Sequence, residues 1–209
     1  MLVGRGGNFG EGRRFALTGV PFYKRGPVYK IDPGKIAGNQ GNPLVKTLIV
    51  MRHAKSDWSV AGQEDFDRVL NKRGRGDLAR MGRAIAAGTT PTLVLCSAAH
   101  RARETAEGVL PFLSAPEVKY DEGLYLAPPA ALHSTLEANG SGAECVLVIA
   151  HNPGMEEWIG QLCGAQVGLP TAGVACIDFG ASDWTRIDRG AGQLRFYLIP
   201  RLLKAIEEQ

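Results

Sequence analysis

Short apolar runs alternate with longer segments whose apolar residues recur at helical spacing over most of this chain. Residues 46–51, 92–96 and 145–150 are apolar almost throughout, which is typical of strands that are buried on both faces of a sheet. Helices are expected between them, at about residues 71–87 and 100–113, with Asn71 as an N-cap. The alternation predicts an α/β fold, a three-layer αβα sandwich with a mainly parallel sheet.

The length and composition are those of an ordinary globular domain. The 209 residues are 44% hydrophobic and 22% charged, so a core of normal size can form without disulfides or structural metals. None of the four cysteines has a partner at CxxC spacing, and we interpret them as small buried residues of a reducing, cytoplasmic environment. No apolar run approaches the roughly 20 residues of a membrane span, so no membrane partner is expected.

The first 45 residues differ from the rest of the chain. They are rich in glycine, lack hydrophobic periodicity, and carry seven basic but only two acidic side chains. We therefore predict a disordered or loosely attached extension over residues 1–45 and one folded domain over residues 46–209. Because the net charge of +3 is concentrated in the extension, the domain lacks the basic excess that nucleic-acid binding requires, and no nucleic-acid partner is expected.

Basic side chains follow each of the three buried strands. Arg52 and His53 follow the first, Arg101 lies shortly after the second, and His151 follows the third directly. Ligands of parallel α/β sheets gather at the carboxyl ends of the strands, and unpaired basic groups are costly to bury. A phosphoryl group explains this convergence, because its oxygens bind fixed cationic donors such as the planar guanidinium of arginine.

The third strand is followed by a helix that begins close to the same edge. Asn152 is expected to cap it and Pro153 to be its first residue. The positive end of the helix then faces the crevice, and Asn152 is a candidate substrate-binding residue.

Several motifs resemble a known family. Arg52-His53 after an apolar strand resembles the signature of the histidine phosphatase superfamily. The similarity to its SixA-type phosphohistidine phosphatase branch is carried by residues 51–58, 65–74, 101–106, 151–154 and 170–173. The resemblance covers about residues 46–200, and it implies a phosphoglycerate-mutase-like fold and a phosphatase that needs neither a metal nor another cofactor.

The resemblance also implies a role for individual residues. His53 is the expected nucleophile, which forms a covalent phosphohistidine that water then hydrolyses. Arg52, Arg101 and His151 are expected to hold the phosphoryl oxygens, and Arg101 fits the family pattern better than Arg103. To attack, His53 must be neutral, so one of its ring nitrogens needs a hydrogen-bond acceptor that fixes the tautomer.

A proton donor for the leaving group is harder to choose. Glu122 is the first candidate, with Asp121 and Asp57 as alternatives. A phosphohistidine substrate depends less on such an acid, because its leaving nitrogen accepts a proton readily. Lys55 and Ser56, next to the nucleophile, are candidate substrate-binding residues.

The favoured function is hydrolysis of a phosphoramidate or phosphoester bond, with phosphohistidine on a protein as the first choice of substrate. A small-molecule phosphomonoesterase or phosphoglycerate-mutase-like enzyme is the main alternative, so the expected partner is a phosphorylated protein or a small phosphorylated metabolite. A catalytically silent phospho-binding module is an alternative of another class. A cysteine phosphatase using Cys96 is disfavoured, because four residues separate it from Arg101 where that chemistry needs five.

Overall fold

The computed structural model describes residues 45–208 of the chain. Its first element, β1, starts at Lys46. The predicted extension over residues 1–45 therefore lies almost wholly outside the described residues, and the boundary at residue 46 stays a prediction.

Six strands and five α-helices alternate along the described part, with short 3₁₀ helices between some of them. The strands are β1 (Lys46–Arg52), β2 (Leu93–Ser97), β3 (Glu117–Asp121), β4 (Cys145–Ala150), β5 (Val174–Phe179) and β6 (Gln193–Leu198). The α-helices are α1 (Lys72–Gly88), α2 (His100–Val109), α3 (Pro129–Asn139), α4 (Gly154–Cys163) and α5 (Pro200–Glu207). Two 3₁₀ helices matter for the site, η2 (Asp65–Asp67) and η4 (Glu122–Leu124).

The strands form one sheet in the order β3-β2-β4-β1-β5-β6. The first four strands in this order run parallel, while β5 is antiparallel to both β1 and β6. The predicted α/β fold with a mainly parallel sheet is confirmed. The antiparallel pair at the edge was not predicted, and its cause is local: β5 and β6 are joined without a crossover helix, which only an antiparallel pair permits.

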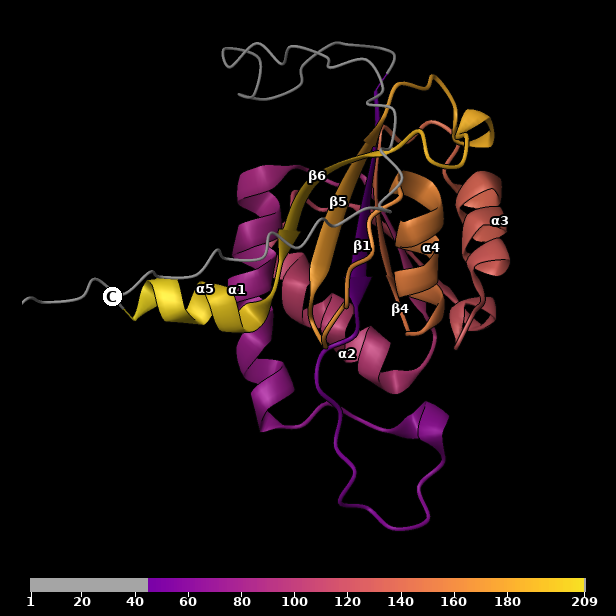
Figure 1. Cartoon of the computed structure of the whole chain (residues 1–209). Coiled ribbons are helices and arrows are strands. Elements are labelled where there is room, and N and C mark those ends of the chain that lie inside the picture. Colours follow the sequence, from indigo (N-terminus) through magenta and orange to yellow (C-terminus); the bar gives the residue numbers. More distant parts are fainter. Residues whose placement is uncertain (1–44, 209) are drawn as a thin grey trace, which may run out of the picture. The chain divides into compact units, whose positions relative to one another are not determined.

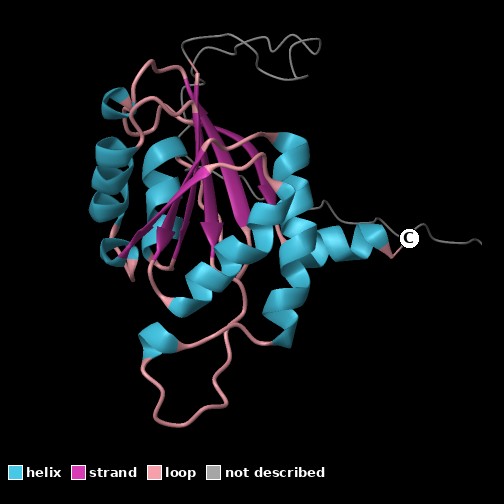
Figure 2. Cartoon of the chain, turned by 180° about the vertical axis from the view of Figure 1, so that it is seen from behind, coloured by secondary structure: helices cyan, strands magenta, loops and turns pink. Residues whose placement is uncertain are grey.

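Helices cover both faces of the sheet (Figures 1 and 2). Along β1 the side chains alternate between two cores: Leu48 and Val50 belong to the core under α3 and α4, whereas Ile49 and Met51 belong to the core under α1 and α2. This alternation follows from the period of two in a strand. All four side chains are fully buried, so β1 is packed on both faces immediately before His53.

The helix ends were predicted in part. Asn71 caps α1 as expected, with its side-chain oxygen accepting a hydrogen bond from Gly74 N at 2.9 Å. The expected cap at Asn152 is wrong. The helix α4 begins at Gly154 with Pro153 in the N-cap position and no side-chain cap, and the Asn152 amide instead donates to the Glu156 carboxylate and the Leu169 carbonyl. Within residues 45–208, no helix has the length and apolar character needed to cross a bilayer.

Candidate active site

A cavity of about 330 Å³ lies beyond the carboxyl ends of β1, β2 and β4. The long loop between β1 and α1 reaches past the strand ends on this side of the sheet (Figure 1). The cavity is lined mainly by charged and polar side chains, and Trp58 and Leu126 are the two apolar residues in its lining. The other lining residues are Arg52, His53, Lys55, Ser56, Asp65, Arg68, Arg101, His151, Asn152 and Thr171.

His53 lies directly after β1 and is only 7% exposed. Its Nδ1 is 2.8 Å from the carbonyl oxygen of Ala54. Because a carbonyl can only accept, Nδ1 carries the proton and Nε2 keeps its lone pair. Burial lowers the pKa of His53 to about 4, and the charges of Arg101 and Arg52 act in the same direction against the Ala54 hydrogen bond. His53 is therefore neutral at physiological pH.

Arg101, at the start of α2, joins the two histidines of the site, His53 and His151. Its Nε donates to His53 Nε2 at 3.3 Å, and its Nη2 donates to His151 Nδ1 at 3.2 Å. Since Nδ1 of His151 accepts, Nε2 carries the proton and donates to Ser97 Oγ at 2.8 Å. Burial, His53 and Arg101 lower the pKa of His151, so both histidines are held neutral around one buried guanidinium.

Thr105 links the loop that follows β1 to α2. Its hydroxyl donates to the Arg101 carbonyl at 2.6 Å and accepts from the Ala54 amide at 2.9 Å. The spacing of Arg101 and Thr105, one helical turn, places both on the same face of α2. One residue therefore fixes both the backbone beside His53 and the helix that carries Arg101.

Arg52 contributes the second guanidinium of the cavity. Its Nη1 donates to the Leu169 carbonyl at 2.9 Å, while its buried Nε has no hydrogen-bond partner among the described residues. Burial lowers the pKa of Arg52, against the charge of Glu156. A buried donor without a partner is costly unless a ligand pairs with it, so the Nε–H group of Arg52 is free to donate a hydrogen bond to an anion.

A carboxylate from the loop between β1 and α1 occupies the other side of the site. Asp65 Oδ2 accepts from Arg101 Nη2 at 2.8 Å and from the Tyr125 hydroxyl at 2.6 Å. Arg101 Nη1 also donates to the Asp65 carbonyl, and Arg68 binds Asp65 Oδ1 at 2.8 Å. Burial alone would raise the pKa of Asp65, but Tyr125 and the two arginines together lower it, so this group is ionised.

The sequence interpretation did not assign Asp65, Arg68, Tyr125 or Ser97 to the site. Ser97 is the last residue of β2, so the rule that singled out the other strand ends also applies to it. Asp65 and Arg68 fall within residues 65–74, which carried part of the family resemblance, and that was the signal available for them.

Comparisons with known proteins show which proteins this chain is similar to. The family model of the histidine phosphatase superfamily (branch 1) matches residues 48–125. A solved structure from Agrobacterium tumefaciens, assigned as the phosphohistidine phosphatase SixA, is 26% identical with a TM-score of 0.64, over 74% of this chain and 98% of that one. The chain is therefore similar to the histidine phosphatase superfamily over residues 48–125. The recognition of the superfamily and of its SixA-type branch is confirmed, and the matches support a phosphatase.

Three further proteins extend the comparison. A structure of the protein histidine phosphatase SixA with tungstate is 23% identical with a TM-score of 0.64, over 75% of this chain and 99% of that one. A phosphoserine phosphatase of Entamoeba histolytica is 15% identical with a TM-score of 0.55, over 75% of this chain and 98% of that one. Both show the fold. A chloroplastic protein of Arabidopsis thaliana is 26% identical, over 71% of this chain and 73% of that protein.

The predicted substrate-binding residues of the histidine phosphatase all line the cavity. Ser56 accepts a hydrogen bond from Arg68 Nη1 at 2.8 Å, which orients that guanidinium. The Asn152 side-chain oxygen is buried and has no partner among residues 45–208. Lys55 lies between Ala54 and Ser56 and adds positive charge at the cavity wall. Their binding roles stay predictions.

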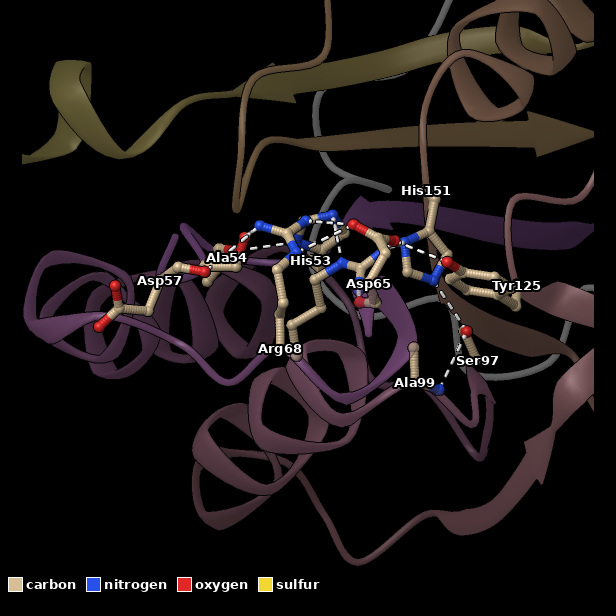
Figure 3. Close-up of polar contacts among 11 residues, drawn as sticks. His53, Ala54, Asp57, Asp65, Arg68, Ser97, Ala99, Tyr125 and His151 are labelled. Atoms are coloured by element: carbon tan, nitrogen blue, oxygen red, sulfur yellow. Dashed lines mark hydrogen bonds and ion pairs between the residues drawn. The ribbon is translucent and has the colours of Figure 1, made fainter. Parts of the chain in front are cut away.

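The predicted acid of the phosphatase lies elsewhere. Glu122 is exposed in η4 and does not line the cavity. Asp121 caps η4 by accepting from Gly123 N at 2.7 Å. Asp57 accepts from Ser59 N, and its carboxylate is directed away from His53 (Figure 3). None of these placements lends support to a role in protonating a leaving group.

Two further side chains can be placed. Cys96 is fully buried in the core, and burial raises the pKa of its thiol, so the structure disfavours the cysteine phosphatase. Arg103 donates to the Ala98 carbonyl and stacks on Tyr120 outside the cavity. Among the described residues, no cluster of three or more histidine, cysteine or acidic side chains has an arrangement that could hold a metal ion.

Proposed function

We propose that the protein hydrolyses phosphohistidine on a protein through a covalent intermediate on His53, without a metal. The observation that carries this proposal is the state of His53: buried, neutral, and with Nδ1 bound to the Ala54 carbonyl, so that Nε2 keeps its lone pair. That lone pair accepts a 3.3 Å hydrogen bond from Arg101 Nε, a donor that the phosphoryl group takes over when substrate binds. A nucleophile of this kind needs neither a general base nor a metal to remove a proton.

Each group in the cavity has a part in the proposed reaction. His53 Nε2 forms a bond to phosphorus while the bond from phosphorus to the substrate nitrogen breaks, and the leaving imidazole takes up a proton. Arg52 and Arg101 stabilise the charge that develops on the equatorial oxygens. Water then attacks phosphorus, the bond to Nε2 breaks, and inorganic phosphate leaves. In the absence of a ligand both ring nitrogens of His151 are engaged. We propose that His151 contacts phosphate after Arg101 has turned to the substrate, in the tautomer in which Nδ1 carries the proton and Nε2 accepts from the Ser97 hydroxyl.

The choice of phosphohistidine rests on the available acids. The alkoxide of an alkyl phosphate is a poor leaving group unless an acid protonates its oxygen. The leaving nitrogen of phosphohistidine, in contrast, accepts a proton readily. Glu122 is outside the cavity, and Asp65, the carboxylate that lines it, has a lowered pKa. Both facts favour a substrate that makes little use of an enzymic acid.

The expected compartment belongs to the same proposal. All four cysteines are free, which fits a reducing cytoplasm. The chloroplastic description of the Arabidopsis relative makes a plastid-type compartment the alternative. Localising a fluorescent fusion of the full chain in its native cell would decide between them.

A substrate panel with a chelator present tests the proposal. Purified protein and its His53→Ala variant are incubated with a histidine-phosphorylated protein and, separately, with sugar and nucleotide phosphates. We expect turnover of phosphohistidine that survives chelation and is lost in the variant. Turnover of small esters alone would instead assign a small-molecule phosphomonoesterase. Saturable phosphate binding without turnover of any substrate would identify a silent binding module.

A further inference from the structure

The mouth of the cavity carries apolar side chains although its floor is strongly basic. Only six large apolar side chains are exposed among residues 45–208. Trp58 and Leu126 are two of them, at 70% and 53% exposure, and both line the cavity. We call Trp58 and Leu126 the apolar rim.

The Trp58 side chain packs on an arginine that is itself held in place by hydrogen bonds. Its ring lies over the Arg68 guanidinium, 3.4 Å from the ring centroid. Arg68 is itself bound by the Asp65 carboxylate and the Ser56 hydroxyl. A cation–π contact at a surface site contributes about 0.5–1 kcal/mol, so the ring is presented in one place while most of its surface stays in contact with water.

Leu126 is held out of the core by its backbone. Its φ of 49° lies in the left-handed region, which is unfavourable for a residue with a branched side chain and often marks a functional position. The preceding residue, Tyr125, is bound to Asp65 by a 2.6 Å hydrogen bond, and its ring packs edge-on against Phe66 with 5.0 Å between the ring centroids. The two loops that form the apolar rim are therefore joined before any substrate arrives.

The combination of floor and rim defines the kind of ligand that fits. Arg52, Arg101 and Lys55 give the cavity positive charge that matches a phosphoryl group. A small hydrophilic phosphate ester would fill the floor and leave the apolar rim in water, whereas a polypeptide can place apolar side chains on the rim while its phosphorylated residue enters the cavity. Exposed apolar surface next to a polar site is typical of protein recognition.

We propose that the apolar rim binds apolar side chains that flank the phosphorylated residue of a polypeptide substrate. This inference rests on the proposed function and adds to it the feature of the substrate by which the enzyme selects it. Trp58 supplies a flat aromatic surface from one loop and Leu126 an aliphatic one from the other. The phosphoryl group fixes the depth of binding, and the flanking side chains determine which phosphorylated segment is preferred.

Matched peptides test the inference. Two histidine-phosphorylated peptides differ only in the residues on either side of the phosphohistidine, leucine in one and serine in the other. For the wild-type full chain we expect a kcat/KM about tenfold higher for the leucine peptide, as burial of one or two apolar side chains would give. In Trp58→Ala/Leu126→Ala this ratio should fall to within about twofold of unity, and Trp58→Phe alone should retain most of it.

Because the ratio compares two substrates of one enzyme, a loss common to both peptides, such as a disturbed Arg68, cancels. The matched control is Ile206→Ala, an exposed apolar residue of α5, which should keep the wild-type ratio. A wild-type ratio near one, or a ratio that survives the double substitution, would overturn the inference while leaving phosphohistidine turnover, and hence the proposed function, intact. If neither peptide is turned over, both the inference and the proposed function are overturned.

The same variants distinguish a peptide substrate from a second copy of this chain as the occupant of the apolar rim. If the apolar rim packs against another copy of this chain, Trp58→Ala/Leu126→Ala would lower the mass measured by light scattering and leave the peptide ratio unchanged. That outcome would replace the peptide by a second copy and contradict the inference. We expect the mass to be the same for the wild type and the double variant.

Discussion

The floor and the wall of the cavity are built in different ways. The floor consists of His53, Arg101 and His151, which lie just after strand ends and are all buried. The wall consists of Asp65 and Arg68 from the loop between β1 and α1, which bind each other, and Tyr125 from another loop donates to Asp65. The sheet fixes the positions of the floor residues before a substrate is present, whereas the wall depends on contacts that a phosphoryl group can replace. We therefore expect substitutions in the floor to affect catalysis strongly and substitutions in the wall to affect binding modestly.

The largest effect is expected for Arg101 in the floor. Arg101→Ala removes the donors to both histidines and a fixed charge beside phosphorus, so kcat/KM on phosphohistidine should fall by about 10²–10³. Arg101→Lys should recover little of this, because an ammonium group does not reproduce the planar fork that bridges two rings. Arg103→Ala, two residues along the same helix and outside the cavity, is the control and should stay within about twofold of the wild type.

The second prediction concerns the charge state of the floor. With a pKa of about 4, His53 should stay neutral until the pH falls well below the usual 6.5 for histidine. In the unfolded chain His53 protonates near 6.5, so the stability that depends on it is present above that pH and decreases as the pH falls from 6.5 toward 4. Following the His53 ring protons by NMR between about pH 7.5 and about pH 3.5 measures this. Titration of His53 near 6.5 would contradict a buried, prepared nucleophile.

A smaller effect is expected from Asp65 in the wall. Its carboxylate occupies donors of Arg101 and Arg68 that a phosphoryl group would use, so Asp65→Asn should tighten the binding of inorganic phosphate by about fivefold, or roughly 1 kcal/mol. Isothermal titration calorimetry measures this directly. Asp67→Asn, in the same 3₁₀ helix and without an arginine partner among the described residues, should leave the affinity unchanged. Weaker binding in Asp65→Asn would show that Asp65 holds Arg101 in place rather than competing with phosphate.

The smallest effect is expected at the boundary of the domain. If residues 46–209 form the catalytic unit, removal of residues 1–44 should leave kcat/KM and the thermal midpoint of unfolding close to those of the full chain. A lower midpoint would show that the removed residues pack against the domain. A loss of activity at an unchanged midpoint would show that they take part in the site.

The difference between floor and wall also explains what the sequence could predict. Buried parallel strands are recognisable as short apolar runs, and topology brings their carboxyl ends together, so Arg52, His53, Arg101 and His151 could be assigned to one site without coordinates. The wall residues lie in loops whose paths depend on tertiary contacts, such as the hydrogen bond between Tyr125 and Asp65. Glu122 shows the same limitation, because four residues along the same segment separate Glu122, which does not line the cavity, from Leu126, which does.

The central claim is that His53 becomes phosphorylated during turnover, and trapping that intermediate tests it most directly. The full chain and His53→Ala are mixed with a histidine-phosphorylated protein, quenched rapidly without acid in the presence of a chelator, and examined by intact mass and fragment mapping. The account predicts a transient mass increase of one phosphoryl group that maps to His53 and is absent from the variant. Phosphate release with no phosphorylated enzyme at any time, or a label that persists in His53→Ala, would contradict it.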